Sequence, residues 1–364
     1  MDDVLTLLTR ANAREVLAAF KLDRLGCLQP LADWLASFPA RRLSRQILRF
    51  DDLVGRRGLA AAGRYILDEF TGSARIEGQR HVPSCGPVLA VANHPGMVDA
   101  MAIWVALECR RDLKIIAAER EILRLIPNIR SRLLFVSPRT RSRSRLLRDA
   151  TDHLRRGGAL LTFPAGTIEP DPSVRVVDAP AGWSDSSELL VRLVPETLVL
   201  PIAVSGVISS TAHRHRIARC FADPKEREWA AATLQVLCRH LRDTRTRVVI
   251  GEPIPSGRFS QRAAICAAMA SLLARVNNGC DENVATSDDA CHGIAMGPVS
   301  EEGEPAGSSS GPHDFHTTAH CHNSIQLRQS CARVLSQSLS RHEAALSPAG
   351  AGCQGGRLCA ERSR

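Results

Sequence analysis

The stretch PVLAVANHPGMVD, residues 87–99, decides the fold of this chain. Its first six residues form an uninterrupted apolar run, which predicts a buried strand over 87–92. A Pro-Gly pair at 95–96 breaks that run, and residues 97–107 then carry the pattern of a helix. Since a strand that turns directly into a helix is the repeating unit of α/β proteins, this stretch predicts an α/β domain.

The same stretch holds a histidine and an aspartate five positions apart, His94 and Asp99. His94 follows the expected strand and Asp99 lies in the first turn of the expected helix, so the two side chains can meet across the turn. On one continuous helix, five residues at about 100° each would leave them roughly 140° apart. Open α/β sheets place ligands at the carboxyl ends of their strands. The pair therefore indicates a general base with an orienting carboxylate, the alternative being a purely structural contact.

Strand and helix continue to alternate from about residue 72 to residue 278. This pattern predicts a mixed, largely parallel sheet covered by helices. Pro201 interrupts the apolar run 199–204, which predicts a bulge or an edge position for that strand. The expected strands end at Ala92, Ala117, Val136, Phe163, Val204 and Ile250, and the expected helices cover 97–107, 144–156, 184–193, 225–241 and 261–276.

Two regions of different composition flank this domain. Residues 1–70 carry apolar residues at helical spacing with interspersed arginines, which predicts a helical segment that packs on the core or lies on a membrane surface. Residues 280–364 are rich in Gly, Ser, His and Cys, so we expect a low-complexity, disordered tail. The His and Cys residues of this tail match no standard metal site, and no metal is expected. The α/β domain is expected to cover 71–279.

Composition limits the class of protein. Of 364 residues, 44% are hydrophobic and 23% charged, as in soluble globular proteins. The chain has no apolar run of 18 residues and begins with acidic residues, so we expect a cytoplasmic protein. A net charge of +9 favours phosphate-bearing partners, but 4% aromatic residues offer few stacking platforms for nucleic acid. Without C-x-x-C pairs before residue 280, the cysteines there are expected as reduced thiols in the core.

Two further strand ends carry chemistry-bearing turns. The turn Phe163-Pro164-Ala165-Gly166-Thr167 offers backbone N–H groups to a phosphate or an oxyanion, although a plain β-turn has the same residues. Arg139 follows the apolar run 133–136, and four more arginines follow within nine residues. These arginines predict either a phosphate-binding surface or a solvated charged face, with Arg139 nearest to the strand end.

In chain order these blocks resemble the glycerophospholipid acyltransferase family, whose type member is 1-acylglycerol-3-phosphate acyltransferase. That family carries an N-H-x4-D box, an apolar block with an arginine, an F-P-E-G-T-R block and an apolar V-P block. The resemblance covers roughly residues 70–255. The corresponding positions here are Asn93-His94 to Asp99, Phe135 to Arg139, Phe163 to Thr167, and Leu200-Pro201.

The resemblance implies transfer of a fatty acyl group from acyl-CoA or acyl carrier protein to a hydroxyl of a lysophospholipid or related lipid. His94 would take the hydroxyl proton, and Asp99 would fix its tautomer and stabilise the imidazolium. Neither a covalent enzyme intermediate nor a cofactor is implied. The enzyme would work as a peripheral protein on the cytoplasmic membrane face. The substrate contacts that the family implies fall on Asn93, Gly96, Arg139, Phe163, Pro164, Gly166 and Thr167.

The chain departs from the family pattern at three positions. Ala165 stands in place of the glutamate of the third block, Ile168 in place of its arginine, and Gly96 in place of a common serine. A lost charge-assisted contact typically costs about 1.5–3 kcal/mol. These losses argue against a glycerol-phosphate acceptor and leave another lysolipid, or an unrelated hydroxyl or amine, as the alternatives. Two alternatives are a non-catalytic protein that binds lipid or acyl carrier, and a thioesterase-like hydrolase that uses water.

Overall fold

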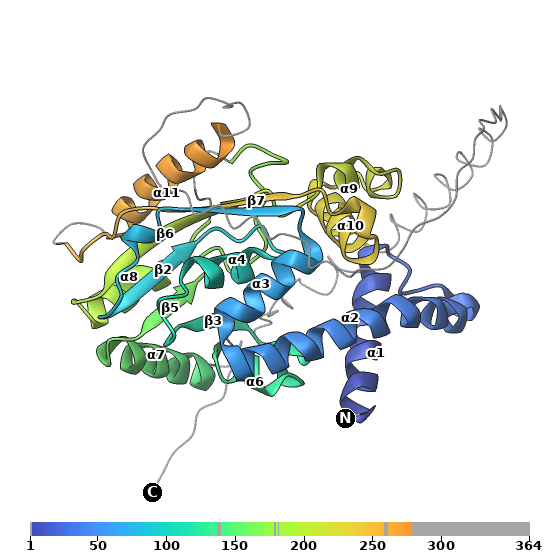
Figure 1. Cartoon of the computed structure of the whole chain (residues 1–364), viewed down its shortest axis with the longest axis horizontal. Coiled ribbons are helices and arrows are strands. Elements are labelled where there is room, and N and C mark those ends of the chain that lie inside the picture. The colour runs from blue at the N-terminus through green and yellow to red at the C-terminus, as the bar shows by residue number, and fades with distance from the viewer. Residues whose placement is uncertain (1, 137–139, 178–179, 181, 258–260, 279–364) are drawn as a thin grey trace, which may run out of the picture. The chain divides into compact units, whose positions relative to one another are not determined.

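The computed structural model describes residues 2–136, 140–177, 180, 182–257 and 261–278. Within these residues seven strands form one sheet with helices on both faces (Figure 1). The strands are β1 Ser73–Glu77, β2 Val88–Ala92, β3 Lys114–Ala118, β4 Leu133–Val136, β5 Ala159–Thr162, β6 Leu198–Ser205 and β7 Arg245–Ile250. Arg139 and residues 280–364 lie outside the described residues, and so do the predictions made for them.

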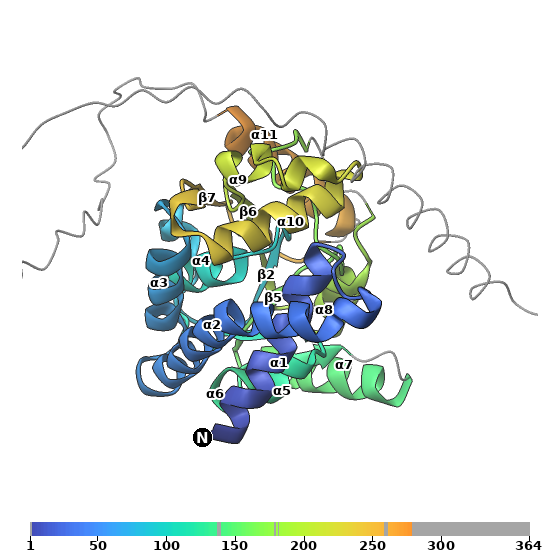
Figure 2. The same ribbon diagram turned by 90° about the vertical axis from the view of Figure 1, so that its right-hand side faces the viewer.

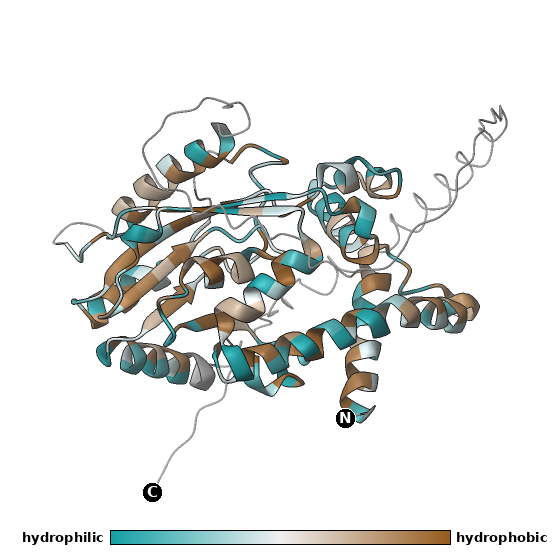
Figure 3. Cartoon of the chain, in the orientation of Figure 1, coloured by the Kyte–Doolittle hydropathy of each residue, from teal (hydrophilic) through white to brown (hydrophobic). Residues whose placement is uncertain are grey.

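The sheet is mixed, with the strand order β1-β7-β6-β2-β5-β3-β4. The β6–β7 pair is antiparallel and every other pair is parallel. This arrangement confirms the predicted fold class. Strand β2 lies in the interior between β6 and β5, and all five of its residues are buried. Parallel strands covered on both faces have continuous apolar sequences, which is why this strand was recognisable (brown in Figure 3).

Side chains of β2 alternate between two apolar layers. Val88, Ala90 and Ala92 belong to one layer, with α3 (Leu59–Phe70), α4 (Asp99–Ala106) and α10 (Pro224–Leu237). Leu89 and Val91 belong to the other layer, with α7 (Thr140–Arg155), α8 (Ser186–Leu193) and α11 (Gln261–Asn278). The carboxyl end of β2 is therefore held from both faces, and it leads directly into His94.

The N-terminal helices are α1 (Asp2–Ala19) and α2 (Gln29–Arg57). The two helices lie against each other (Figure 2). Small side chains meet between them, among them Ala13, Ala36 and Ala40. The second half of α2 joins the core of the α/β domain, where Phe50 stacks on Trp104 with ring centroids 5.8 Å apart. The remaining elements are the helices α5 Glu121–Arg124, α6 Pro127–Arg130 and α9 Ser210–Arg214, and 3₁₀ turns at Gly26–Leu28, Gln79–His81, Ala218–Cys220 and Arg239–Leu241.

Several sequence expectations need correction. The edge position predicted for the proline strand is wrong, because β6 is an interior strand. The bulge lies in the partner segment, where the pairing shifts by one residue between Ile202↔Ile250 and Val199↔Ile254, and Pro201 faces this shift. Four of the six described cysteines, expected in the core, are exposed: Cys27, Cys85, Cys109 and Cys220.

Element boundaries also differ in places. Strand β1 was missed because it is largely exposed and has no apolar run. Helix α4 begins at Asp99, two residues later than predicted, since the chain is still turning at Met97. In the described part of the chain, no helix is both long and apolar enough to cross a membrane.

Candidate active site

The turn between β2 and α4 brings the predicted pair together. Gly96 and Met97 both have a positive φ, +87° and +53°, so the chain reverses direction within two residues. Glycine adopts this conformation freely, whereas the β-carbon of Met97 makes it cost on the order of 1–2 kcal/mol. Such strain persists where the surrounding structure enforces it. This reversal of the chain brings the Asp99 carboxylate next to the His94 ring.

Asp99 is almost completely buried and fully hydrogen-bonded. Its side chain Oδ2 accepts the Gly96 N–H at 2.8 Å, and its Oδ1 accepts the Ala100 N–H at 2.6 Å. Oδ2 also accepts a hydrogen bond from His94 Nδ1 at 2.7 Å. These three hydrogen bonds hold the Asp99 carboxyl group in one orientation.

The His94 imidazole is held in the orientation that a general base needs. Nδ1 donates its proton to Asp99, so the lone pair lies on Nε2. The side chain is 28% exposed, and Nε2 has no hydrogen-bond partner among the described residues. The Phe163 ring stacks on the imidazole, with centroids 4.3 Å apart and planes at 26°. His94 therefore presents a free basic nitrogen at the carboxyl edge of the sheet.

Electrostatics tune this base. Burial lowers the pKa of His94, but the hydrogen bond to Asp99 and the negative charges of Asp99 and Glu169 outweigh burial. The positive charge of Arg120 acts in the opposite direction. The net result is a pKa above the ordinary histidine value of 6.5. A raised pKa strengthens the base and stabilises the imidazolium that forms when it takes a proton.

Asn93, a predicted substrate contact, bonds through its side chain to the backbone of β6. Its Nδ2 donates to the Val204 carbonyl at 2.8 Å, and its Oδ1 accepts the Val204 N–H at 2.8 Å. The side chain is buried, with 2% of the residue exposed. Asn93 therefore ties the end of β2 to β6, directly before His94.

The 163–167 turn lies beside the His–Asp pair through Phe163. Gly166 closes the turn by donating its N–H to the Phe163 carbonyl at 3.0 Å, with φ +66°. Gly166 and Thr167 are exposed at its tip, whereas Pro164 is buried. The exposed backbone at the tip is suited to receive an anionic group near His94.

Gly96 and Ile168, two of the three positions that depart from the family pattern, lie against each other. A β-carbon at Gly96 would lie 3.2 Å from Cδ1 of Ile168. The Ile168 side chain is 47% exposed. The missing side chain at position 96 therefore makes room for the isoleucine, which puts an apolar surface beside the catalytic turn.

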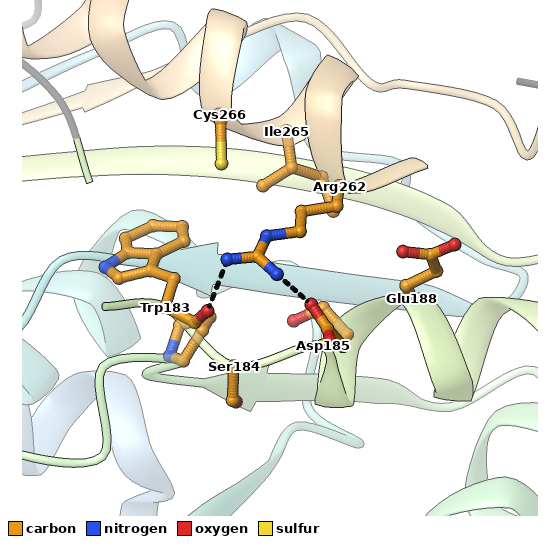
Figure 4. A pocket seen from close by; sticks show the side chains of 9 residues that line it. Trp183, Ser184, Asp185, Glu188, Arg262, Ile265 and Cys266 are labelled. Atoms are coloured by element: carbon orange, nitrogen blue, oxygen red, sulfur yellow. Dashed lines mark hydrogen bonds and ion pairs between the residues drawn. The ribbon is translucent and has the colours of Figure 1, made fainter. Parts of the chain in front are cut away.

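A small pocket borders this turn at Pro164 (Figure 4). Arg262 crosses it, and its guanidinium donates to the Trp183 carbonyl at 3.2 Å and pairs with Asp185. The pocket does not include His94. Within the residues that the structure describes, no group of three or more His, Cys, Asp or Glu side chains is placed to hold a metal ion.

Three residues near the pair were given no role by sequence reasoning. Arg120 is the second residue after β3, so the strand-end rule that found His94 also applies to it. Glu169 bonds to the His94 backbone across 75 positions, and Trp183 bonds to Glu169. No local pattern in the sequence predicts either of these two contacts.

Comparisons with known proteins agree with this geometry. Residues 73–205 match the family model described as Acyltransferase, a range that contains the His–Asp pair and the 163–167 turn. A crystal structure of the 1-acyl-sn-glycerophosphate (LPA) acyltransferase PlsC from Thermotoga maritima is similar at 20% identity. The match covers 76% of this chain and 90% of that chain, with a TM-score of 0.37. No curated protein sequence matches the chain.

Residues 73–205 thus form an α/β acyltransferase domain. The N-H-x4-D box and the ordered downstream blocks lie largely within this matched range, and they resemble those of the glycerophospholipid acyltransferase family.

Proposed function

We propose that this protein moves a fatty acyl group from an acyl thioester to a hydroxyl of a lysophospholipid or related lipid, with His94 as the general base. One observation carries the proposal. The Nδ1 atom of His94 is fixed by Asp99 at 2.7 Å, inside the region that matches the acyltransferase family. The unbonded Nε2 is then the atom that accepts the hydroxyl proton.

The proposed reaction needs no covalent enzyme intermediate. The acceptor hydroxyl gives its proton to Nε2 while its oxygen attacks the thioester carbonyl. The tetrahedral intermediate collapses, the C–S bond breaks, and the imidazolium returns the proton to the leaving thiolate. Asp99 stabilises the imidazolium throughout, and the backbone N–H of Thr167, at the exposed tip of the turn, is a candidate for the oxyanion. General base catalysis of this kind contributes about 10²–10⁴-fold.

The donor is proposed to be acyl-CoA or acyl carrier protein. Both carry phosphate, and a carrier protein adds an acidic surface. Arg120 lies near enough to act on the charge of His94, and Arg145 and Arg148 are exposed on α7. These cations support an anionic donor. The apolar Ile168 beside the catalytic turn supports an acceptor that presents no charged group at that point.

Membrane docking is proposed through the outer face of α2, defined by Leu31, Trp34, Leu35 and Phe38 together with Leu28, which directly precedes the helix. Each of these side chains is more than half exposed. They recur every three or four residues and so share one side of the helix, while small alanines face α1. An ordinary surface helix buries its large apolar residues and exposes its polar ones, so this helix has the reverse arrangement.

Basic residues extend this outer face. Arg41, Arg42 and Arg45 are exposed one to two turns further along α2. An apolar face flanked by arginines suits insertion at the interface of an anionic bilayer. We therefore propose that the protein docks peripherally on the cytoplasmic membrane face, with the outer face of α2 in the headgroup region.

An acceptor screen tests the proposed reaction. Purified protein is incubated with labelled acyl-CoA or acyl carrier protein and single lysolipids, and products are identified by mass. We expect a diacylated product and acceptor-dependent thiol release. Free fatty acid released equally with and without acceptor would indicate a thioesterase instead, and vesicle binding without any transfer would indicate a non-catalytic lipid-binding protein.

A further inference from the structure

Glu169 bonds to both backbone polar groups of His94. Its N–H donates to the His94 carbonyl at 2.7 Å, and its Oε2 accepts the His94 N–H at 2.8 Å. The backbone of the base is thereby clamped by a single residue from another loop. Since Asp99 fixes the imidazole itself, Glu169 and Asp99 together hold His94 at its two ends.

The Glu169 carboxylate is in turn anchored to the core on the α8–α11 face of the sheet. Its Oε1 accepts the indole N–H of Trp183 at 2.8 Å. Trp183 is 5% exposed and packs in that apolar layer. The Trp183 carbonyl also accepts a hydrogen bond from Arg262 at 3.2 Å (Figure 4). The clamp on His94 thus rests on a rigid part of the molecule.

The charge of Glu169 also acts on His94. Burial raises the pKa of Glu169, and the N–H groups of Trp183 and His94 partly offset this by bonding to its ionised form. The negative charge of Glu169 raises the pKa of His94, as that of Asp99 does, while the charge of Arg120 lowers it. Glu169 therefore combines a geometric contact with an electrostatic one.

We propose that Glu169 is a positioning residue for His94, one that fixes the backbone of the base and stabilises the imidazolium formed during acyl transfer. This inference rests on the proposed function. Glu169 lies four positions after Ala165, the position where the family pattern has a glutamate. The alternative is a brace that only holds two loops together.

Three variants separate these roles. Glu169→Gln keeps the size of the side chain and one accepting oxygen but removes the charge. Glu169→Ala removes both side-chain hydrogen bonds, the one from the His94 N–H and the one from the Trp183 indole. Trp183→Phe removes only the indole donor. The matched control is Glu228→Gln on α10. This change neutralises another buried carboxylate, which forms an ion pair with Arg175 at 3.3 Å. We expect kcat to fall about 10–100-fold in both Glu169 variants, with KM for the acceptor within twofold of wild type, and less in Trp183→Phe.

A second readout does not depend on activity. The pKa of His94 is measured by NMR titration of histidine ring protons, with the His94 signal assigned by its loss in His94→Gln. We expect a lower pKa for His94 in Glu169→Gln than in wild type, and no change in Glu228→Gln. An unchanged pKa in a folded Glu169→Gln protein would overturn the proposal. Absence of transfer by wild type would refute the proposed function instead, because the titration is still measurable.

Discussion

At the scale of single residues, the catalytic pair depends on a conformation that secondary-structure patterns do not encode. His94 and Asp99 meet because Gly96 and Met97 turn through the left-handed region. The sequence indicates that a turn is present, since a Pro-Gly pair ends an apolar strand. The strained φ of Met97 and the raised pKa of His94 depend on neighbours brought in by the fold.

Asp99→Asn tests the orienting carboxylate. Below its pKa the imidazole is protonated and cannot act as a base, so the rate falls as pH drops through the pKa of His94. Because that pKa is raised, the fall occurs at a higher pH than for an ordinary histidine. Asp99→Asn removes the charge and disfavours the Nδ1–H tautomer, so we expect the acid limb to move to lower pH and kcat to drop by about 10³–10⁴-fold. Profiles of kcat/KM against pH measure both effects, and coincident acid limbs would contradict this role.

Gly96→Ala tests the contact between the two departures from the family pattern. The new β-carbon would adopt φ +87° and lie 3.2 Å from Ile168. We expect the free energy of unfolding to fall by about 1–2 kcal/mol from the backbone alone, with a further steric loss. Thermal unfolding of Gly96→Ala with and without Ile168→Ala separates these parts, since the second change relieves only the steric one. Equal stability of Gly96→Ala and wild type would refute the argument.

At the scale of elements, the predictable parts were those with one dominant pattern. Strand β2 was recognised because it is buried on both faces, and α11 because its apolar residues recur at helical spacing. Strand β1 was missed because an exposed edge strand needs no apolar run. The edge position inferred from Pro201 was wrong, since β6 tolerates the missing N–H where the pairing with the segment after β7 shifts.

Asp171 tests how the loop after the 163–167 turn is attached to β6. It is fully buried, and its Oδ2 accepts the N–H groups of Val207 and Ile208 at 2.8 Å each. Its Oδ1 accepts the Gly206 N–H at 2.8 Å. Asp171→Asn replaces one acceptor oxygen with a donor, so we expect the free energy of unfolding to fall by at least about 2 kcal/mol. Chemical denaturation measures this, and a change below about 0.5 kcal/mol would contradict it.

The outer face of α2 is tested by vesicle binding. Replacing Leu31, Trp34 and Phe38 with serine removes three large apolar side chains, each worth about 1.5–3 kcal/mol when fully buried. We expect at least tenfold weaker sedimentation with anionic vesicles. The matched control is Trp229→Ser, which changes an exposed tryptophan, 46% accessible, on α10. Equal binding of the triple variant and wild type would refute docking through this face.

At the scale of the whole molecule, the sequence predicted the fold class and the His94–Asp99 contact, but not how distant segments meet. Asn93 and Val204 bond across 111 positions, and His94 and Glu169 across 75. Only the strand order, with β2 next to both β5 and β6, brings these segments to one sheet edge. Arg120 reaches the same edge from β3. The contact between His94 and Asp99 was therefore predictable, whereas the contacts that Glu169 and Arg120 make with His94 required the three-dimensional arrangement.

The central claim is that His94 removes the acceptor proton during acyl transfer. It is tested most directly by thiol release from acyl-CoA with a lysolipid present, comparing wild type with His94→Ala and with the control His213→Ala on α9. The account predicts that His94→Ala loses about 10²–10⁴-fold in acceptor-dependent turnover while remaining folded, and that His213→Ala keeps wild-type turnover. Unchanged turnover in a folded His94→Ala protein would contradict it.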